Sequence, residues 1–531
     1  MTAAIPTVSR WRKLPRTIFS AAVLAASLVG GRAEAQAGRA SPDSVLEAIR
    51  REGMEHSQAE PLAQALMDSI GPRLTGTAGE KAARDWLIGR YRAWGVDARN
   101  EQYGTWTEWR RGATHVDLLE PRVRTLNGTL LAYSPGTRGP VQAEAVAVPA
   151  FTSPAELNAW LPSVKGKLVL ASAAPATCRP DESWERAATP ETLERMRRDR
   201  GAADTAWRRS LDAAGISPRW LPMKLEAAGA AGVIAVSWTG GWGADRVMNA
   251  WTLRMPMVTL DCEDYGLVHR LASHGQKPVL RVDADAQFGG DVPVFNTVAT
   301  IRGSEHPEEF VVLSAHLDSW DGGSGATDNG AGTVAVMEAV RILRQAYPHP
   351  RRTIVIGHWG GEEEGLNGSG AFAADHPQVV GGMQALFNID LGTGRIDSVS
   401  MGGLAGAGPV VRRWLSRIPV SLAGPVSVDE PGTSTEGHSD HSSFACRGAP
   451  AFDLLPVEWD YRAYTWHTGR DTYDKLVMDD VRSNAVLLAM LAYLAAEDPQ
   501  RVPRDRASNA AMAPCTKPAR SMIEFLESLL Q

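Results

Sequence analysis

Segments typical of strands and segments typical of helices alternate along the chain from Val294 onward, and this alternation restricts the fold more than any other feature. Short apolar runs predict strands near residues 309–315, 353–358, 385–389 and 450–455. Patterns with a helical period predict helices near residues 330–346, 368–375, 408–418 and 479–496. Such alternation is typical of α/β folds with a mainly parallel sheet. We therefore expect an α/β domain in the second half of the chain.

Ionisable side chains stand where the predicted strands end. In an open α/β sheet, ligands bind at the carboxyl ends of the strands, so residues that follow successive strands meet at one edge. The residues in these positions are His316 and Asp318, Asp328 after a glycine-rich loop, Glu362, Glu363 and Glu364, Asp390, and Tyr464 and His467. Each predicted strand thus brings an oxygen or an imidazole to the same edge.

Carboxylates and imidazoles without thiolates suit zinc in an open catalytic site, or cobalt or manganese. The set holds too many carboxylates for one zinc with three protein ligands, whereas two ions that share a bridging carboxylate would use them economically. In two-metal hydrolases the ions lie about 3.5–4 Å apart and together acidify a bound water. A further carboxylate is then needed as the general base, and Glu362, Glu363 and Glu364 are adjacent candidates for ligand and base.

Each of these features also has an ordinary structural explanation. A glutamate triplet is most often a solvated turn, and a pair such as His316 and Asp318 is more often a hydrogen-bonded strand end than a metal site. Five such features at successive strand ends favour a shared function over independent accidents.

Six short motifs follow one another along the chain: HLD, GATDNGAG, GEEEGLNGS, NIDLG, SDHSSF and HTGRDT. In these motifs and their order the chain resembles the cocatalytic zinc aminopeptidase and carboxypeptidase family, over about residues 41–498. The extended HLDSWD and the late HT-x-x-DT resemble the carboxypeptidase Q-like branch more than the simple bacterial aminopeptidases. The resemblance implies a three-layer αβα sandwich around a mainly parallel, mixed sheet.

The resemblance also implies roles for the residues at the strand ends. It implies two Zn²⁺ ions, with Co²⁺ or Mn²⁺ as alternatives for one of them. The expected ligands are His316 and Asp390 for one ion, Glu363 and His467 for the other, and Asp328 as the bridge. Glu362 is then the expected general base, a choice among neighbouring glutamates that the residues alone leave open. The peptide bond between Asp328 and Asn329 resembles one that is often cis in this family.

Four further residues have expected places around the metals. Asp318 resembles the carboxylate that orients a ligand imidazole in this family, here that of His316. Asp440 and His441, in the SDHSSF motif, are candidates for a place beside the ligands or the substrate, with ordinary loop hydrogen bonding as the alternative. Tyr464 is a candidate donor to an oxyanion, with packing in its loop as the alternative.

Residues 140–287 differ in character from the sequence on either side. Their KGKLVL and LEAAGAAGVIAVS segments resemble a β-rich protease-associated domain, which covers an active site or mediates contacts and carries no catalytic residues. A charged stretch from Arg179 to Arg209 within it is expected to be a solvated helical excursion. The expected division of the chain is a signal peptide at 1–35, an N-terminal part of the peptidase domain at 36–139, the inserted domain at 140–287, the catalytic core at 288–498, and a tail with a terminal helix at 499–531.

The first 35 residues have the pattern of an export signal. Basic residues up to Arg16 precede an apolar run at 18–29, and Ala33-Glu34-Ala35 offers a small-x-small cleavage site. The run is too short to cross a bilayer, although an uncleaved anchor is the alternative. We therefore expect a periplasmic or extracellular protein with no stable membrane span after cleavage.

The net charge and the cysteine pattern argue against a nucleic-acid-binding protein and against a thiolate zinc site. A net charge of −6 gives no signature of polyanion binding, so no nucleic-acid partner is expected. The 4 cysteines form no CxxC pair, so a thiolate zinc knuckle is not indicated. Export would permit disulfides, but the sequence does not specify which cysteines pair.

The function expected from all of this is an exported di-zinc exopeptidase that acts on short peptides or dipeptides. Two alternatives stay open: a glutaminyl-cyclase-like enzyme on the same core, and a catalytically inactive, receptor-like binding protein of the same fold. The complete set of five ligand positions favours the hydrolase. Members of this family often form dimers, so the resemblance adds a homodimer to the expected partners.

Overall fold

A computed structural model describes residues 42–432, 439–508 and 514–528 of the chain. The predicted signal peptide at residues 1–35 lies outside the described residues. The predicted core strands are confirmed as β9 (His306–His316), β10 (Arg352–Trp359), β11 (Met383–Ile389) and β14 (Ala451–Pro456). The predicted core helices are confirmed as α9 (Ala331–Ala346), α10 (Asn367–Asp375), α12 (Ala407–Leu415) and α15 (Met478–Glu497).

The sheet of the core is mixed and mainly parallel, as the sequence predicts. Strands β14, β11, β9 and β10 lie side by side in that order and are parallel to one another. The edges add antiparallel strands, with β12 (Ile396–Ser400) against β14 and β8 (Val279–Ile301) against β10. A short strand, β13 (Ser427–Asp429), pairs with β12.

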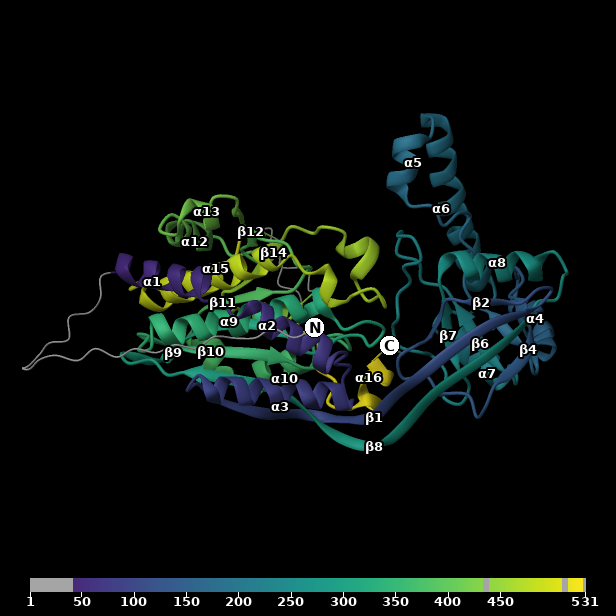
Figure 1. Ribbon diagram of the computed structural model, residues 1–531, viewed down its shortest axis with the longest axis horizontal. Helices are drawn as coiled ribbons and strands as arrows, with labels where there is room; N and C mark the ends of the chain where they lie inside the picture. Colours follow the sequence, from purple (N-terminus) through teal and green to yellow (C-terminus); the bar gives the residue numbers. More distant parts are fainter. Residues whose placement is uncertain (1–41, 433–438, 509–513, 529–531) are drawn as a thin grey trace, which may run out of the picture. The chain divides into compact units, whose positions relative to one another are not determined.

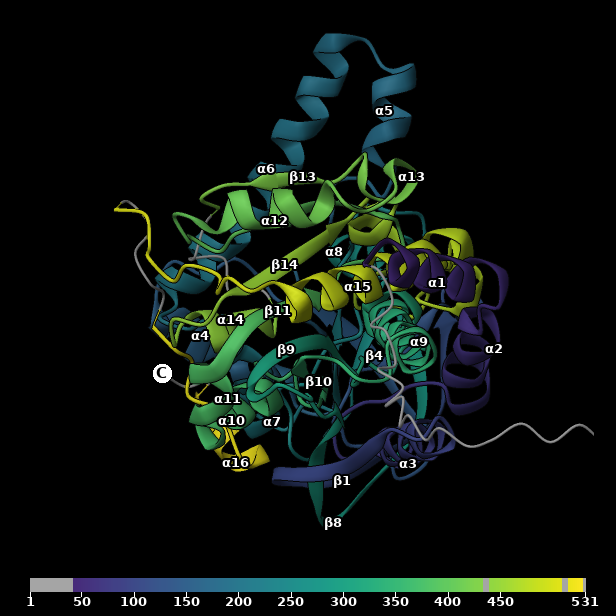
Figure 2. The same ribbon diagram turned by 90° about the vertical axis from the view of Figure 1, so that its left-hand side faces the viewer.

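Both faces of this sheet are buried, which explains why its strands are apolar without interruption. Successive side chains of β9 point to opposite faces: Val311 and Leu313 pack with α9 and α15 in one core, and Val312 packs with α10 in another. The first core also contains residues of α1 (Pro42–Glu55), α2 (Ala59–Gln64) and α3 (Ala78–Ala93). The second also contains residues of α11 (Pro377–Gly382) and α14 (His441–Ala445). Figure 2 shows α9 and α10 on opposite sides of the strands, the arrangement of a three-layer αβα sandwich.

Two long antiparallel strands join the core to the inserted segment. β1 (Asp97–Glu120) pairs with β8 along most of its length, so that one end of the pair borders β10 and the other borders β4 (Val141–Ala147) (Figure 1). The short strand β2 (Arg124–Leu126) folds back onto β1. Strand β8 runs without a break through the expected boundary at 287/288, and the division of the chain into domains stays a prediction.

The inserted segment contains a small parallel sheet and several helices. β5 (Leu168–Leu170), β6 (Gly232–Ala235) and β7 (Met257–Leu260) are parallel, with β3 (Gly128–Leu130) antiparallel to β7. The helices are α4 (Pro154–Trp160), α5 (Asp181–Ala187), α6 (Pro190–Ala213), α7 (Leu221–Ala227) and α8 (Cys262–Ser273). Helices α5 and α6 make up the charged stretch at 179–209 and add much helix to a segment that the resemblance describes as β-rich.

Two disulfides and a terminal helix complete the fold. Cys178 pairs with Cys262, and Cys446 pairs with Cys515. The remaining helices are α13 (Val420–Ala423) and α16 (Met522–Ser528), the latter within the predicted terminal helix. Within the described ranges, no helix has the length and apolar character needed to cross a membrane.

Candidate metal centre

Five of the predicted site residues meet at the carboxyl edge of the parallel strands. Their side-chain donor atoms form two groups, one of His316, Asp328 and Asp390 and one of Asp328, Glu363 and His467. Asp328 belongs to both groups. All five side chains are buried or nearly so, with His316 at 1% exposure.

The register of the sheet explains why residues so distant in sequence meet here. His316 ends β9 directly beside Trp359, the last residue of β10, so the Gly360–Glu364 loop starts next to the imidazole. On the other side Ser314 pairs with Asn388, which places Asp390 beside His316 just beyond the end of β11. Asp328 enters from the helical turn Ala326–Gly330 before α9, and the bond between it and Asn329 is cis. His467 follows the turn Tyr461–Thr465.

The donor atoms are spaced as ligands of shared ions would be. His316 Nε2 lies 3.1 Å from Asp390 Oδ1 and 3.4 Å from Asp328 Oδ1. His467 Nε2 lies 3.1 Å from Glu363 Oε2 and 3.2 Å from Asp328 Oδ2. Two ligands held about 2.0–2.1 Å from one tetrahedral zinc ion lie roughly 3.3–3.4 Å apart. The two oxygens of Asp328 thus face one imidazole each, the arrangement required of a bridging carboxylate.

The hydrogen bonding and charge of these residues also fit bound cations. Asp328 Oδ2 and Glu363 Oε1 are buried and accept no hydrogen bond within the described part of the chain, although buried polar atoms in proteins are nearly always paired. Burial by itself would lower the pKa of His467, but Glu363 and Asp328 raise it to about 10. The carboxylates therefore attract positive charge into a buried site, and oxygen and imidazole donors are the ligands that zinc accepts.

Glu362 lies in a different environment from its neighbour Glu363. Burial raises the pKa of the Glu362 carboxyl well above its ordinary value, against the opposing effect of His316. Glu362 is absent from both ligand groups. A buried carboxyl with a raised pKa beside the metal positions has the properties of a general base.

The side chain of Asp318 supports the loop that carries Glu362 and Glu363 by binding the backbone of that loop. Its Oδ1 accepts the N–H of Glu362 at 3.2 Å, and its Oδ2 accepts the N–H of Glu363 at 3.1 Å. The nearest partner of His316 Nδ1 is the carbonyl oxygen of Asp318 at 3.0 Å, while the Asp318 carboxylate lies 3.7 Å away. Asp318 thus holds both the imidazole and the two glutamates, the imidazole mainly through its main chain.

The other three candidate residues lie outside both ligand groups. Asp440 is fully buried, and neither of its carboxylate oxygens accepts a hydrogen bond from the residues that the structure describes. Burial raises its pKa to about 8, with His316 and Asp390 among the charges that act on it. His441 Nδ1 lies 3.5 Å from Asp453 Oδ1. The half-buried ring of Tyr464 packs beside Gly241 of the inserted segment. Neither His441 nor Tyr464 belongs to a ligand group.

Sequence reasoning missed several residues that hold the centre together. Arg73 is fully buried and donates to the carbonyl oxygens of Gly71, Leu317, Ser324 and Gly325 at 2.7–3.0 Å. It thereby holds both ends of the loop between His316 and Asp328. The GPRLTG turn that contains Arg73 gave no sign of this role, because the contacts with Leu317, Ser324 and Gly325 each span more than two hundred residues.

A second support that the sequence did not reveal lies under the glutamate loop. Glu364 is buried and accepts hydrogen bonds from Thr75 Oγ1 at 2.8 Å and from Tyr133 OH at 2.7 Å. Burial raises the pKa of Glu364 to about 8. Tyr461 is also buried close to the ligands, since Asp328, Asp390 and Glu363 add to the effect of burial in raising its pKa.

The inserted segment contacts the loop that carries His467. The N–H of Val247 donates to the carbonyl of His467 at 2.7 Å, and Thr239 Oγ1 donates to the carbonyl of Ala463 at 2.5 Å. The Arg246 guanidinium lies 4.5 Å from the centre of the Trp466 ring. His467 itself has a positive φ of 61°, a conformation that this loop and its contacts must enforce.

Comparisons with known proteins agree with this geometry. Residues 296–500 match the sequence profile of Peptidase family M28. Carboxypeptidase Q of Mus musculus is 26% identical over 443 residues, which cover 83% of this chain and 86% of the mouse protein. Carboxypeptidase Q of Xenopus laevis is 27% identical over 442 residues, which cover 82% of this chain and 86% of the frog protein.

Solved structures show the same fold. A Peptidase M28 precursor from Shewanella amazonensis superposes with a TM-score of 0.66 at 25% identity, covering 87% of this chain and 98% of that one. A zinc aminopeptidase from Bacillus subtilis superposes with a TM-score of 0.55 at 18% identity, covering 84% and 96% of the two chains. With its α/β core, its paired ligand groups and the match of residues 296–500 to Peptidase family M28, this chain is a metallo-exopeptidase whose core is similar to that family.

Proposed function

We propose that this protein is an exported di-zinc exopeptidase that hydrolyses short peptides or dipeptides. The observation that carries the proposal is the shared carboxylate: Asp328 presents one oxygen to His316 and the other to His467. A single-ion site has no need of a carboxylate placed in this way. The two disulfides are compatible with export, because disulfides persist in oxidising compartments.

The residues of the two groups divide between two ions. His316 and Asp390 would hold one zinc, Glu363 and His467 the other, and Asp328 both. Zinc bound there would polarise the scissile carbonyl and make an attacking water more acidic. Cobalt or manganese could replace one zinc, because the donors are all oxygen or imidazole.

Glu362 acts as the general base in this proposal. It accepts a proton from the attacking water and returns it to the nitrogen of the leaving amine. A hydrogen bond from the backbone N–H of Glu362 to the Asp318 carboxylate holds the main chain that carries this base. Burial raises the pKa of its carboxyl above the ordinary value, which makes it a stronger proton acceptor than an exposed glutamate.

The preference for short substrates rests on the likeness to the carboxypeptidase Q proteins, since the ligand set itself serves any peptide bond. The end of the peptide that is recognised can be found with free, amino-blocked and carboxyl-blocked di- and tripeptides. Tolerance of an amino block would exclude an aminopeptidase or a dipeptidase. We also propose that residues 140–287 form a protease-associated domain, and that the protein forms a homodimer.

The substitution Glu362→Gln tests the mechanism. The variant should bind zinc as the wild type does and lose at least about a hundredfold in kcat, because general acid–base catalysis contributes about 10²–10⁴-fold. Glu47→Gln, an exposed glutamate on α1 that pairs with Arg50, is the matched control. If Glu362→Gln kept both metals and most of its turnover, the assignment would be wrong. A wild-type protein that binds zinc but cleaves no peptide would favour a binding protein instead.

A further inference from the structure

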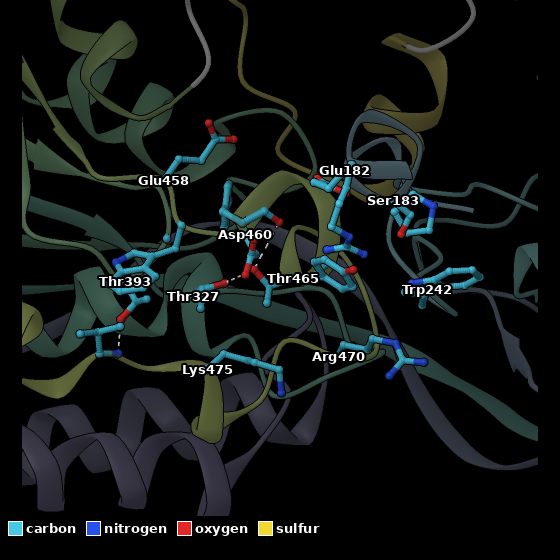
Figure 3. Close-up of a pocket in the computed structure, with 17 residues that line it drawn as sticks. Glu182, Ser183, Trp242, Thr327, Thr393, Glu458, Asp460, Thr465, Arg470 and Lys475 are labelled. Carbon is cyan, nitrogen blue, oxygen red and sulfur yellow. Dashed lines mark hydrogen bonds between the residues drawn. The ribbon is translucent and has the colours of Figure 1, made fainter. Parts of the chain in front are cut away.

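A pocket of about 620 Å³ lies between helix α5 of the inserted segment and the loop that leads to His467. Figure 3 shows Glu182, Ser183 and Trp242 on one side of this pocket and Thr327, Thr393 and Glu458 on the other. We propose that this pocket receives an aromatic side chain of the peptide substrate, and that Trp242 determines this preference. The inference rests on the proposed function and adds to it the class of substrate.

The pocket adjoins the metal positions along the chain. Thr327, Gly392 and Thr465 line it, and each lies within two residues of Asp328, Asp390 or His467. Thr327 and Thr465 also join two of these segments, because their hydroxyls share a hydrogen bond of 2.8 Å. The pocket wall is thus continuous with the backbone that carries the ligands. Its volume falls within the range of about 300–1,000 Å³ that is usual for ligand pockets.

Exposed tryptophans mark the pocket as a binding surface for apolar groups. In the described part of the chain, three tryptophans are more than a third exposed: Trp220 at 37%, Trp242 at 44% and Trp459 at 58%. Trp242 and Trp459 both line the pocket, together with Tyr461 and Tyr464. Large aromatic side chains left exposed in one concave place are typical of ligand sites, whereas scattered ones are ordinary.

A side-chain contact restrains Trp242, and an unusual backbone conformation marks Trp459. The Arg179 guanidinium lies 5.3 Å from the centre of the Trp242 ring, and Arg179 directly follows Cys178, which is bonded to Cys262. On the opposite wall Trp459 has a positive φ of 48°. This conformation is strained for a bulky residue and persists where the surrounding structure enforces it. The Arg179 contact thus restrains the Trp242 ring, and the main chain at Trp459 is fixed by the structure around it.

Helix α5 supplies the remaining part of the pocket wall. The charged stretch at 179–209 therefore takes part in a pocket, which its sequence did not predict. Its sequence predicts a solvated excursion, yet Glu182, Ser183 and Arg186 line the same pocket as Tyr461. The inserted segment thus contributes side chains to the substrate pocket, although it contributes none to the two ligand groups. We expect substrate preference to change with α5 and Trp242 while the metals stay bound.

The experiment compares the zinc-loaded wild type with Trp242→Ala on Phe-Ala, Ala-Phe and Ala-Ala. For the dipeptide whose phenylalanine enters the pocket, kcat/KM should fall about tenfold, chiefly through KM, since a lost apolar contact is worth about 10–200-fold. Hydrolysis of Ala-Ala should change less than about twofold. Trp242→Phe should recover most of the loss. Trp220→Ala, an equally exposed tryptophan of the same segment outside the pocket, is the control and should behave as the wild type.

A binding measurement separates the pocket from the reaction. Calorimetry with zinc-loaded Glu362→Gln and the preferred dipeptide should show about tenfold weaker binding once Trp242→Ala is added. A wild type that cleaves all three dipeptides, with Trp242→Ala leaving their ratios unchanged, would overturn the pocket assignment and leave the peptidase intact. Binding that depends on Trp242 without any hydrolysis by the wild type would overturn the peptidase mechanism and support the pocket.

Discussion

The backbone N–H of Asp328 donates to the carboxylate of Asp471 at 3.0 Å. The same carboxylate accepts the N–H and the hydroxyl of Thr327 at 2.7 and 2.8 Å. Asp471 belongs to the HTGRDT motif, four residues after His467. One buried side chain therefore ties the segment of the bridging residue to the segment of a ligand that lies far along the chain.

Replacing Asp471 should weaken metal binding. In Asp471→Asn an N–H₂ group stands in place of one acceptor oxygen, so a backbone N–H of Thr327 or Asp328 loses its partner. Loss of such a supporting contact typically costs about 10–100-fold in metal affinity. Competition with a chromogenic chelator measures this. Asp474→Asn, an exposed carboxylate three residues later, is the control, and equal affinities in the two variants would contradict the role of Asp471.

The two ligand groups should be separable by mutation. His316→Ala and His467→Ala should each lower the bound zinc from about two equivalents to about one, because each imidazole belongs to only one group. Asp328→Ala should weaken both sites. Mass spectrometry under native conditions counts the ions, with the exposed His274→Ala as control. Two zinc equivalents retained by His316→Ala would remove His316 from the ligand set.

Removal of the metals should destabilise the fold. Ions that bind only the folded chain stabilise it by about 2.7 kcal/mol at a hundred times their Kd. The chelated protein also keeps three carboxylates close together without a cation. We expect Tm to fall on chelation and to recover when zinc is added, as followed by calorimetry. Recovery with Mg²⁺ instead of zinc would contradict the donor set, because Mg²⁺ avoids imidazole ligands.

Arg73 should matter more for stability than any exposed arginine. Arg73→Met leaves four buried carbonyl oxygens without their donor, and each unsatisfied buried group costs about 1–3 kcal/mol. We expect the free energy of unfolding in urea to fall by at least about 3 kcal/mol. Arg92→Met, an exposed position on α3, should change it by less than about 0.5 kcal/mol. Arg73→Lys keeps the charge but has fewer hydrogen-bond donors. Its free energy of unfolding should lie between those of Arg73→Met and Arg92→Met.

Asp245 should give the stability a pH dependence of its own. Burial raises its pKa to about 7 in the folded chain, against 3.8 as the ordinary value, although Thr259 and the N–H of Ser237 donate to it. Between these pH values the folded chain binds the extra proton, so stability is greatest at low pH and falls as pH rises toward 7. The slope contributed is at most about 1.4 kcal/mol per pH unit.

Urea unfolding of the wild type and Asp245→Asn at pH 5, 6 and 7 isolates this effect, since the metals and other groups act on both proteins alike. The wild type should lose stability relative to the variant as the pH rises. A difference between the two that stays constant across this range would show that Asp245 is ionised throughout in the folded state.

The local sequence was sufficient to predict the helices and strands of the core and the types of residue that could bind a metal. Strand β9 follows from a short apolar run, as expected where both sheet faces are buried, and helix α9 follows from an apolar pattern of helical period. Because parallel strands end at one edge, the acids and histidines that follow them were expected to meet. The family resemblance then assigned roles among Glu362, Glu363 and Glu364, which adjacency alone could not separate.

Only the tertiary structure decided which atoms meet and what supports them. The two oxygens of Asp328 face different imidazoles, Arg73 holds the loop before it, and Trp242 enters a pocket beside the His467 loop. The disulfide partners, which the sequence left open, are decided at the same level. Local periodicity carries no record of these contacts, because their partners are brought together by strand register and by the packing of distant segments. The amino-acid sequence alone thus determined the chemistry of the candidate metal centre, and the fold determined its geometry and the pocket beside it.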